Sequence, residues 1–395
     1  MFIKLIIKDP KEIKTIKSRL ENEGLLNKRY KIENKNGVFS IYTKLETLPC
    51  AYQSFNYEEY EEIKTTKITL ESIIRSYNIK TGLCLEIPKR WSIYPPMILF
   101  NAFKELTFPK DLCIEILSHQ STIFGVTGLS HIAVNQPIIE SDILRRPHNL
   151  KPMYGNFGPD LESDHIPTSI DFQEAFWCYV IQNGIYQTWA PKYTMFSRGN
   201  IKEKSRILQS FKNLNNSIIF DLYCGIGYFS LSYLKNGGKL LCWEMNPWSI
   251  EGFRRSLETG NYKYRIYSPN DVFEIKDLND VDVCIFYESN DNVPIRLQNV
   301  NDISLNVSHV NLGLLPSSKA SWSLTKNLMN KAKTSSTIHI HENCHIDDFD
   351  KLKQEIIDYF KPNCEILQLE KVKTFAPDIW HIVIDVKLNN ALNKI

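Results

Sequence analysis

The sequence lacks the patterns that define several classes of protein. Its nine cysteines stand singly, without a CxxC pair, which excludes a zinc ribbon or a three-cysteine iron–sulfur motif and favours reduced thiols. No apolar run approaches the roughly 20 residues that span a membrane. The N-terminus carries its basic residues after its apolar stretch, unlike a signal peptide. We therefore expect a cytoplasmic protein without membrane contact.

Patterns for metal binding or for nucleophilic catalysis are also missing. No Ser-His-Asp arrangement or carboxylate pair stands out. The residues that invite a metal interpretation are His339, His341, Glu342 and His345. On a strand His339 and His341 share one face, whereas Glu342 points the other way. Because the spacing places no third ligand, we expect no metal and interpret this stretch as a polar strand at a pocket mouth.

What is present is the composition of a globular protein with more than one domain. Apolar residues make up 43% and charged residues 23% of the 395 positions, enough to bury a core. We predict a small basic domain over 1–60, a central α+β domain over 61–185 and a Rossmann-like domain over 186–395. The formal net charge is only +2, so a nucleic-acid partner would have to meet a local basic patch.

The central region mixes helical and extended patterns. We expect a helix over 70–77, a strand over 112–116 and a helix over 172–183. A Pro-, Gly- and Asn-rich loop interleaves cations with rings at Arg145, Arg146, His148, Lys151 and Tyr154. Such a surface can hold phosphates and stack unpaired bases, and an ordinary polar loop is the alternative.

The most informative stretch is IIFDLYCGIGYFSLSYLKNGGKLLCWEMNP, over 218–247. An apolar run ends on Asp221, the chain turns through Gly225 and Gly227, a helical pattern follows, and a second apolar run ends on Glu244. This order is typical of the nucleotide-binding half of a doubly wound α/β sheet. The glycines let a ligand approach backbone N–H groups, and Glu244 can accept hydrogen bonds from a ribose diol.

The loop also restricts the ligand. Tyr228 and Phe229 stand where a dinucleotide-binding fold would want a third glycine, which leaves little room for a pyrophosphate. An adenosine without phosphate fits better, and S-adenosylmethionine meets that description. The alternative is a tight strand–helix turn with no ligand.

Other candidate residues flank this unit. Ser197, Arg198 and Lys204 lie in a turn and basic helix that lead into it, where Arg198 or Lys204 can pair with a carboxylate. The loop after the third strand holds Asp271 and Val272, where this fold reads an adenine edge. A later strand carries His309 and Asn311, which we treat with Arg198 as catalytic candidates because doubly wound sheets place their chemistry at the carboxyl edge. A hairpin over 365–386 closes the sheet.

Together these segments resemble the eukaryotic wybutosine-synthesising protein 2 family, which is related in fold to the tRNA guanine-N1 methyltransferases. The matching segments are QTWAPKYTMFSRGNIKEKSRI, FDLYCGIGYFSLSYL, CWEMNPWSIEGFRRSL, HVNLGLLPSS, HIHEN and VKTFAPDIWHIVIDV. HIAVNQPI and RPHNLKPMYGNFGP are similar to the family's central domain. The loop SPNDV departs from the family's G-D-N run. The resemblance implies a class I S-adenosylmethionine-dependent transferase domain at the C-terminus, preceded by smaller α+β domains.

The resemblance also implies the reaction. Family members transfer the 3-amino-3-carboxypropyl arm of S-adenosylmethionine to the 4-demethylwyosine base 3′ of the tRNA-Phe anticodon, releasing methylthioadenosine. The implied cofactor contacts are Ser197, Lys204, Glu244, Asp271 and Val272, and the central domain is expected to contact the tRNA. We expect a monomer. The alternatives are a tRNA guanine-N1 methyltransferase of the same architecture, a non-catalytic tRNA-binding protein and a small-molecule methyltransferase.

Overall fold

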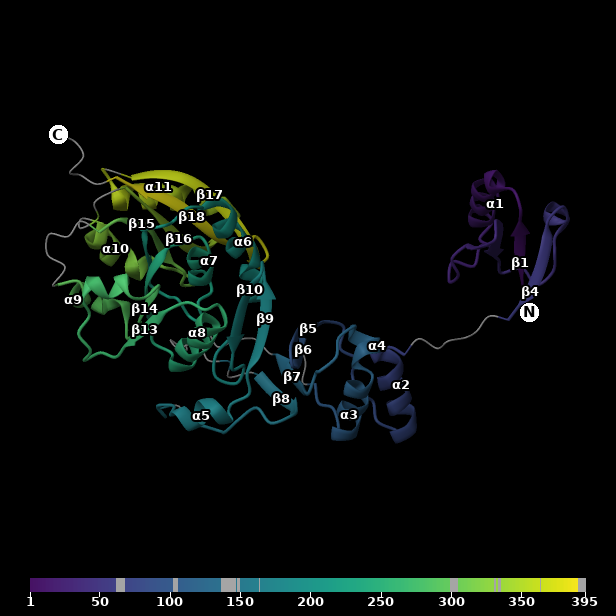
Figure 1. Cartoon of the computed structure of the whole chain (residues 1–395), viewed down its shortest axis with the longest axis horizontal. Coiled ribbons are helices and arrows are strands. Elements are labelled where there is room, and N and C mark those ends of the chain that lie inside the picture. The colour runs from purple at the N-terminus through teal and green to yellow at the C-terminus, as the bar shows by residue number, and fades with distance from the viewer. Residues whose placement is uncertain are drawn as a thin grey trace. The chain divides into compact units, whose positions relative to one another are not determined.

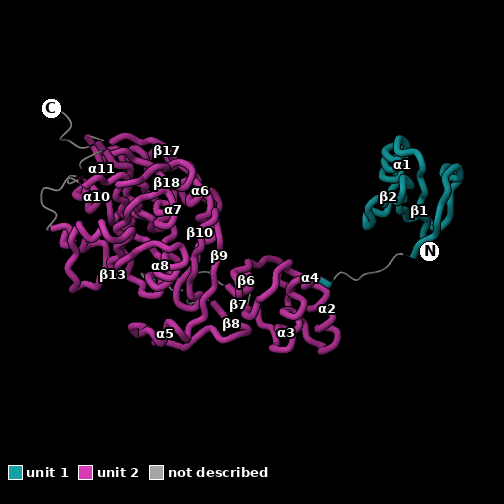
Figure 2. The backbone as a smooth tube through the Cα atoms, viewed as in Figure 1, with its two compact units in different colours: residues 1–68 teal, residues 69–395 magenta. Residues whose placement is uncertain are grey.

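A computed structural model describes residues 1–61, 68–101, 106–135, 147, 150–162, 164–298, 305–329, 332, 335–362 and 364–389. The chain forms two compact units, residues 1–68 and 69–395 (Figure 2). The expected boundary at residue 185, inside the second unit, stays a prediction. Of the predicted RNA-binding loop, Arg145, Arg146 and His148 lie outside the described residues. None of the described helices is both long and apolar enough to cross a membrane.

The first unit is a small antiparallel sheet covered by one helix. Its strands lie in the order β2-β3-β1-β4. Helix α1 begins where the Asp9 side chain accepts from the Lys11 backbone N–H, with Pro10 as first helical residue. Ile3 and Leu5 pack in one cluster with Leu20. The elements are β1 Phe2–Ile7, α1 Pro10–Asn22, β2 Glu33–Lys35, β3 Val38–Tyr42 and β4 Asn56–Tyr60.

The second unit opens with a four-stranded sheet in the order β5-β6-β7-β8. The strand predicted over 112–116 is wrong, because these residues belong to helix α3. Leu112 and Ile116 are buried whereas Ile114 is exposed, which is a helical and not an alternating pattern. The elements are α2 Leu70–Thr81, β5 Trp91–Tyr94, β6 Met97–Asn101, α3 Lys110–Ser118, α4 Gln120–Phe124, β7 His131–Asn135 and β8 Leu150–Tyr154 (Figure 1).

A hairpin replaces most of the helix predicted over 172–183. Helix α5 (Ser169–Glu174) ends early, and β9 (Cys178–Gln182) pairs with β10 (Ile185–Trp189). Asn183 and Gly184 between the strands both have positive φ, as a two-residue Asn-Gly turn requires. The Asn-Gly dipeptide is a local hairpin signal, and it decides against the helix that the preceding apolar pattern favours.

The rest of the unit is one eight-stranded sheet in the order β13-β14-β12-β11-β15-β16-β18-β17, which confirms the predicted fold class. The first six strands of this order run parallel, and the C-terminal hairpin, yellow in Figure 1, adds β18 antiparallel to β16. The strands are β11 Ile218–Asp221, β12 Lys239–Glu244, β13 Tyr264–Tyr267, β14 Val283–Tyr287, β15 Val307–Leu312, β16 Ser336–His345, β17 Cys364–Ala376 and β18 Ile379–Leu388.

Both faces of this sheet are buried. Phe220 and Leu241 pack in the core of one face, and their neighbours Ile219 and Leu240 pack in the core of the other. Continuous apolar strands of this kind are typical of parallel sheets covered by helices. The helices are α6 Ile201–Ser210, α7 Ser230–Lys235, α8 Pro247–Thr259, α9 Val293–Arg296, α10 Trp322–Met329 and α11 Phe349–Phe360.

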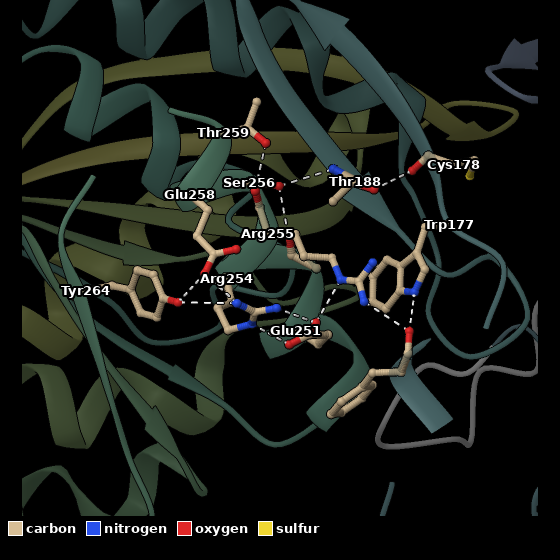
Figure 3. Close-up of polar contacts among 12 residues, drawn as sticks. Trp177, Cys178, Thr188, Glu251, Arg254, Arg255, Ser256, Glu258, Thr259 and Tyr264 are labelled. Carbon is tan, nitrogen blue, oxygen red and sulfur yellow. Dashed lines mark hydrogen bonds and ion pairs between the residues drawn. The ribbon is translucent and has the colours of Figure 1, made fainter. Parts of the chain in front are cut away.

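Helix α8 fixes the hairpin β9–β10 against this sheet (Figure 3). The guanidinium of Arg255 lies 4.0 Å from the Trp177 ring centroid and donates to Glu251 at 2.7 Å. The Thr188 backbone N–H donates to Ser256 Oγ at 3.1 Å. At Gly252 a Cβ atom would lie 2.7 Å from the Thr188 carbonyl oxygen, so only glycine permits this approach. These contacts position the segment that follows β10 and leads to the site.

Candidate active site

A cavity of about 890 Å³ lies at the carboxyl edge of the parallel strands, where this fold binds ligands. Residues after β11, β12, β14 and β15 line one part of it. Residues of β5 and β6, the segment 194–200, the end of β17 and Asn343 of β16 line much of the rest. Among the sequence-predicted site residues, the lining includes Ser197, Arg198, Gly225 and Glu244.

Glu244 ends β12 with its carboxylate held by backbone donors. Gly225 N–H donates to Oε2 at 2.9 Å, and the N–H groups of Met245 and Asn246 donate to Oε1 at 3.0 and 2.8 Å. Burial raises the pKa of Glu244, although these three donors oppose that shift. The carboxylate therefore has a fixed orientation at the cavity surface, with acceptor capacity left for a ligand.

The two glycines of the loop have different surroundings. Both have positive φ, +54° at Gly225 and +79° at Gly227. Gly225 lines the cavity, whereas Gly227 faces the core, where a Cβ atom would lie 2.4 Å from the Phe253 ring. Gly227 therefore allows the loop to pack closely against helix α8, and its predicted cofactor contact stays a prediction.

Three predicted polar residues lie behind the cavity lining. Asp221 is fully buried and accepts from Ser230 Oγ at 2.6 Å and from Asn311 Nδ2 at 3.0 Å. Burial raises the pKa of Asp221. His309 Nδ1 lies 2.9 Å from His339 Nε2. Asp221 and Asn311 lie close to the glycine loop, whereas His309 pairs with Ile219 inside β11. None of the three lines the cavity, and their roles stay predictions.

The loop beside Glu244 is not the one that the sequence predicts. Asp271 and Val272 are absent from the cavity lining, because β14 lies between β12 and β13. Tyr287 of β14 pairs with Glu244, so the residues after β14, 288–290, reach the cavity. The sequence signal for this loop was an acidic residue, Glu288, directly after an apolar strand, as at Glu244.

Arg296 joins the two loops. Its guanidinium donates to the buried Glu288 carboxylate through Nε and Nη2, both at 2.7 Å. The same group donates to the carbonyl oxygen of Ser268 at 2.7 Å and to that of Asp271. The loop of Asp271 and Val272 is thus tied to the cavity-lining loop. The adenine contact assigned to those two residues stays a prediction.

The segment before α6 and the edge strand β17 each supply one cation to the cavity lining, Arg198 and Lys373. Ser197 precedes the 3₁₀ turn η2 (Arg198–Asn200), and Arg198 Nη1 donates to Ser92 Oγ of β5 at 3.1 Å. Lys373 of β17 lines the cavity too and donates to Ser197 Oγ at 2.9 Å. Lys373 is not among the sequence-predicted site residues, because nothing in its local pattern separates it from other lysines on an edge strand.

Lys204 lies behind the lining. It is 3% exposed, and its Nζ donates to Gln182 at 3.1 Å and Gln187 at 2.5 Å. The ammonium lies 4.8 Å from the Phe196 ring centroid and 5.5 Å from that of Tyr228, and both rings line the cavity. Burial lowers the pKa of Lys204 to about 7. Its predicted cofactor contact stays a prediction.

Replacing Lys204 with methionine is expected to make stability less dependent on pH. The unfolded lysine binds its proton below its ordinary pKa of 10.5, and the folded one only below about 7, so wild-type stability rises between these values. As pH falls from 9.5 to 7.5, the free energy of unfolding of Lys204→Met should therefore rise relative to that of the wild type, by about 1.4 kcal/mol per pH unit. Urea unfolding measures this, with the exposed Lys80→Met as control. A difference independent of pH would contradict it.

No family model matches the chain. Among curated relatives, tRNA wybutosine-synthesizing protein 2 of Schizosaccharomyces pombe is 40% identical over 76% of this chain and 73% of the relative. The Saccharomyces cerevisiae protein of the same name is 34% identical over 98% of both chains. The Danio rerio homolog is 28% identical over 82% of this chain and 74% of its own.

Solved structures share the fold. Trm5b from Pyrococcus abyssi has a TM-score of 0.55 at 15% identity, covering 98% of this chain and 100% of that one. P. horikoshii TYW2 in complex with MeSAdo has a TM-score of 0.51 at 17% identity, covering 81% of this chain and 100% of that one. At these identities the likeness concerns the fold alone. The sequence relatives go further: the chain belongs to the family of tRNA wybutosine-synthesizing protein 2.

Proposed function

We propose that the chain transfers the 3-amino-3-carboxypropyl group of S-adenosylmethionine to the 4-demethylwyosine base 3′ of the tRNA-Phe anticodon, releasing methylthioadenosine. The observation that carries the proposal is the 34% sequence identity to a wybutosine-synthesizing protein 2 in an alignment that covers 98% of both chains. S-adenosylmethionine is accordingly the co-substrate and tRNA the macromolecular substrate.

The cavity fits an adenosine derivative. Its volume, about 890 Å³, is within the range of small-molecule sites. We assign the ribose hydroxyls to Glu244, whose orientation its three backbone donors fix. We assign the adenine to the loop 288–290, where Asn290 Nδ2 donates to the Leu222 carbonyl oxygen at 2.9 Å. Ser197 then faces the amino-acid arm, with the cations beside it.

Positioning selects the reaction. A sulfonium has three carbons open to attack, and the product depends on which carbon lies in line with the acceptor. When an acceptor atom of the base bonds to the arm, the carbon–sulfur bond breaks and its electron pair stays on sulfur as a neutral thioether. The positive charge passes to the base, which becomes neutral by releasing a proton to water. Because sulfonium is already a good leaving group, the protein mainly has to hold the arm, and Arg198 remains a candidate partner for its carboxylate.

The remaining cavity surface suits a flat base. Tyr94 and Met97 of the smaller sheet line it, together with Phe196, Tyr228 and Phe375. Phe196 and Tyr228 are stacked, with ring centroids 6.0 Å apart. Aromatic side chains of this kind stack unpaired bases of RNA. We place the acceptor base in this part of the cavity.

A double-label assay tests the reaction. The protein is incubated with precursor tRNA and S-adenosylmethionine labelled either in the carboxyl group or in the methyl group. We expect the carboxyl label alone to enter tRNA, together with methylthioadenosine release. Methyl label in tRNA would instead establish a methyltransferase of the same architecture, which the fold shared with Trm5b keeps as the second candidate. Cofactor binding without any modification would indicate a non-catalytic tRNA-binding protein.

We further propose that the chain acts as a monomer in the cytoplasm. All nine cysteines are free thiols, which suits a reducing compartment. Sedimentation of the purified protein and fractionation of cells test the two statements separately.

A further inference from the structure

Three residues form a row across the C-terminal strands of the sheet. Asn343 of β16 pairs with His381 of β18, and His381 pairs with Lys373 of β17. Directly paired residues on neighbouring strands point to the same face of a sheet. The two outer members of the row, Asn343 and Lys373, both line the cavity, whereas His381 between them is buried and lies 3.0 Å from His341.

Lys373 brings a half-buried cation to the cavity without a counter-charge. Within the described part of the chain, no carboxylate lies within ion-pair distance of its Nζ, whose one hydrogen bond goes to Ser197 Oγ at 2.9 Å. Its stem crosses Gly199, where a Cβ atom would lie 2.4 Å from Lys373 Cδ. Burial lowers the pKa of Lys373. A cation in this position is stabilised by an anionic ligand.

Asn343 contributes a hydrogen-bond acceptor that has no donor. Its Oδ1 is buried and accepts no hydrogen bond from any residue that the structure describes, although its backbone N–H donates to the Pro316 carbonyl oxygen at 2.7 Å. Buried acceptors are normally satisfied. The row therefore places at the cavity wall a cation that lacks an anionic partner and a buried amide oxygen that lacks a hydrogen-bond donor.

The pair suits the two charged groups of an α-amino acid head group. A carboxylate accepts a hydrogen bond from the Lys373 ammonium, and an α-ammonium donates to an amide oxygen such as Asn343 Oδ1. A phosphodiester would satisfy Lys373 but has no donor for Asn343.

We propose that Lys373 and Asn343 bind the head group of the S-adenosylmethionine arm, with Lys373 on the carboxylate and Asn343 Oδ1 on the ammonium. The assignment rests on the proposed function and names the subsite that holds the transferred arm. Arg198, which is exposed and donates to Ser92, then lies at the rim and is not the main carboxylate partner.

Binding measurements without tRNA test this subsite. We compare the dissociation constants of S-adenosylmethionine and methylthioadenosine, which lacks the head group, by calorimetry. Lys373→Met and Asn343→Leu should each weaken S-adenosylmethionine about tenfold or more and leave methylthioadenosine within about twofold. Lys373→Arg, which keeps the charge, should retain most of the affinity. The matched control is Lys371→Met on the same strand, whose ammonium lies over the Phe349 and Trp380 rings.

The outcomes separate the alternatives. If the variants lose affinity equally for S-adenosylmethionine and methylthioadenosine, the row only maintains the fold. If their affinity for S-adenosylmethionine is unchanged, the row is not part of the binding site. Either result overturns the proposal. A tenfold loss of affinity that is selective for S-adenosylmethionine in Arg198→Gln, with no such loss in Lys373→Met, overturns it as well. Because no acceptor is present, these measurements stand apart from the double-label assay. Methyl transfer there would refute the proposed reaction and leave the binding result valid.

Discussion

Replacing Glu244 with glutamine is expected to weaken S-adenosylmethionine binding about 100-fold while the protein stays folded. The carboxylate accepts from three backbone N–H groups and has acceptor capacity left for the ribose diol. Hydrogen bonds to a charged acceptor contribute about 1.5–3 kcal/mol each, and about 1.4 kcal/mol is a factor of ten. Glutamine has one acceptor oxygen instead of two, and its amide N–H₂ would face a backbone N–H. Isothermal titration measures the dissociation constant.

Two further measurements sharpen this result. Glu355→Gln, an exposed carboxylate paired with Lys319, is the matched control and should leave affinity unchanged. Burial raises the pKa of Glu244, so wild-type affinity should fall on acidification at a higher pH than an ordinary carboxylate would give. That dependence should vanish in Glu244→Gln. An unchanged dissociation constant would remove Glu244 from the site.

The largest loss of stability is expected from Arg206→Met, at about 3–5 kcal/mol. Arg206 donates to Asp385 through Nη1 at 2.5 Å and Nη2 at 3.0 Å. It also donates to Glu203 through Nε at 2.7 Å and Nη2 at 2.6 Å. Glu203 is 0% and Asp385 4% exposed. Removing the guanidinium takes the cationic partner from buried Glu203 and leaves buried Asp385 only its contact with His339 at 2.7 Å. This is costlier than losing a surface pair.

Urea unfolding near neutral pH measures this loss. The control is Arg75→Met, because Arg75 forms an exposed pair with Glu71 and its removal should change stability by less than about 0.5 kcal/mol. A loss below about 1 kcal/mol in Arg206→Met would contradict the assigned role of the network.

The same network predicts how stability responds to acid. Burial alone would raise the pKa of Asp385, but His339 and Arg206 hold it well below its usual range. A carboxylate with a lowered folded pKa stabilises the fold above its unfolded value of about 3.9 and loses that contribution as pH falls further. The network also ties α6 to β18, and α6 begins directly after Ser197–Asn200. Its loss should therefore disturb the cavity as well.

Much of the site was visible in the sequence because its signals are local. The run from Ile218 to Glu244 places an apolar strand, two glycines, a helix and an acid in fixed order, and the structure forms these elements as β11, α7 and β12. Because β11 and β12, which are consecutive in the chain, pair in parallel, the Gly225 N–H comes to lie 2.9 Å from Glu244 Oε2. Local patterns gave the wrong element where apolar residues fit both a helical and a strand periodicity. The sequence predicts a strand where the structure forms helix α3, and a helix where it forms strand β9.

The sequence by itself determined the nucleotide-binding unit and the family, because short-range periodicity, turn residues and family motifs suffice for both. Only the tertiary structure decided which side chains share the cavity. The insertion of β14 between β12 and β13 brings Glu288 beside Glu244 and moves Asp271 one strand away. The pairing of β16, β18 and β17 places Lys373 in one row with Asn343. Strand order and register arise from contacts between residues distant in the chain, and no local pattern encodes them.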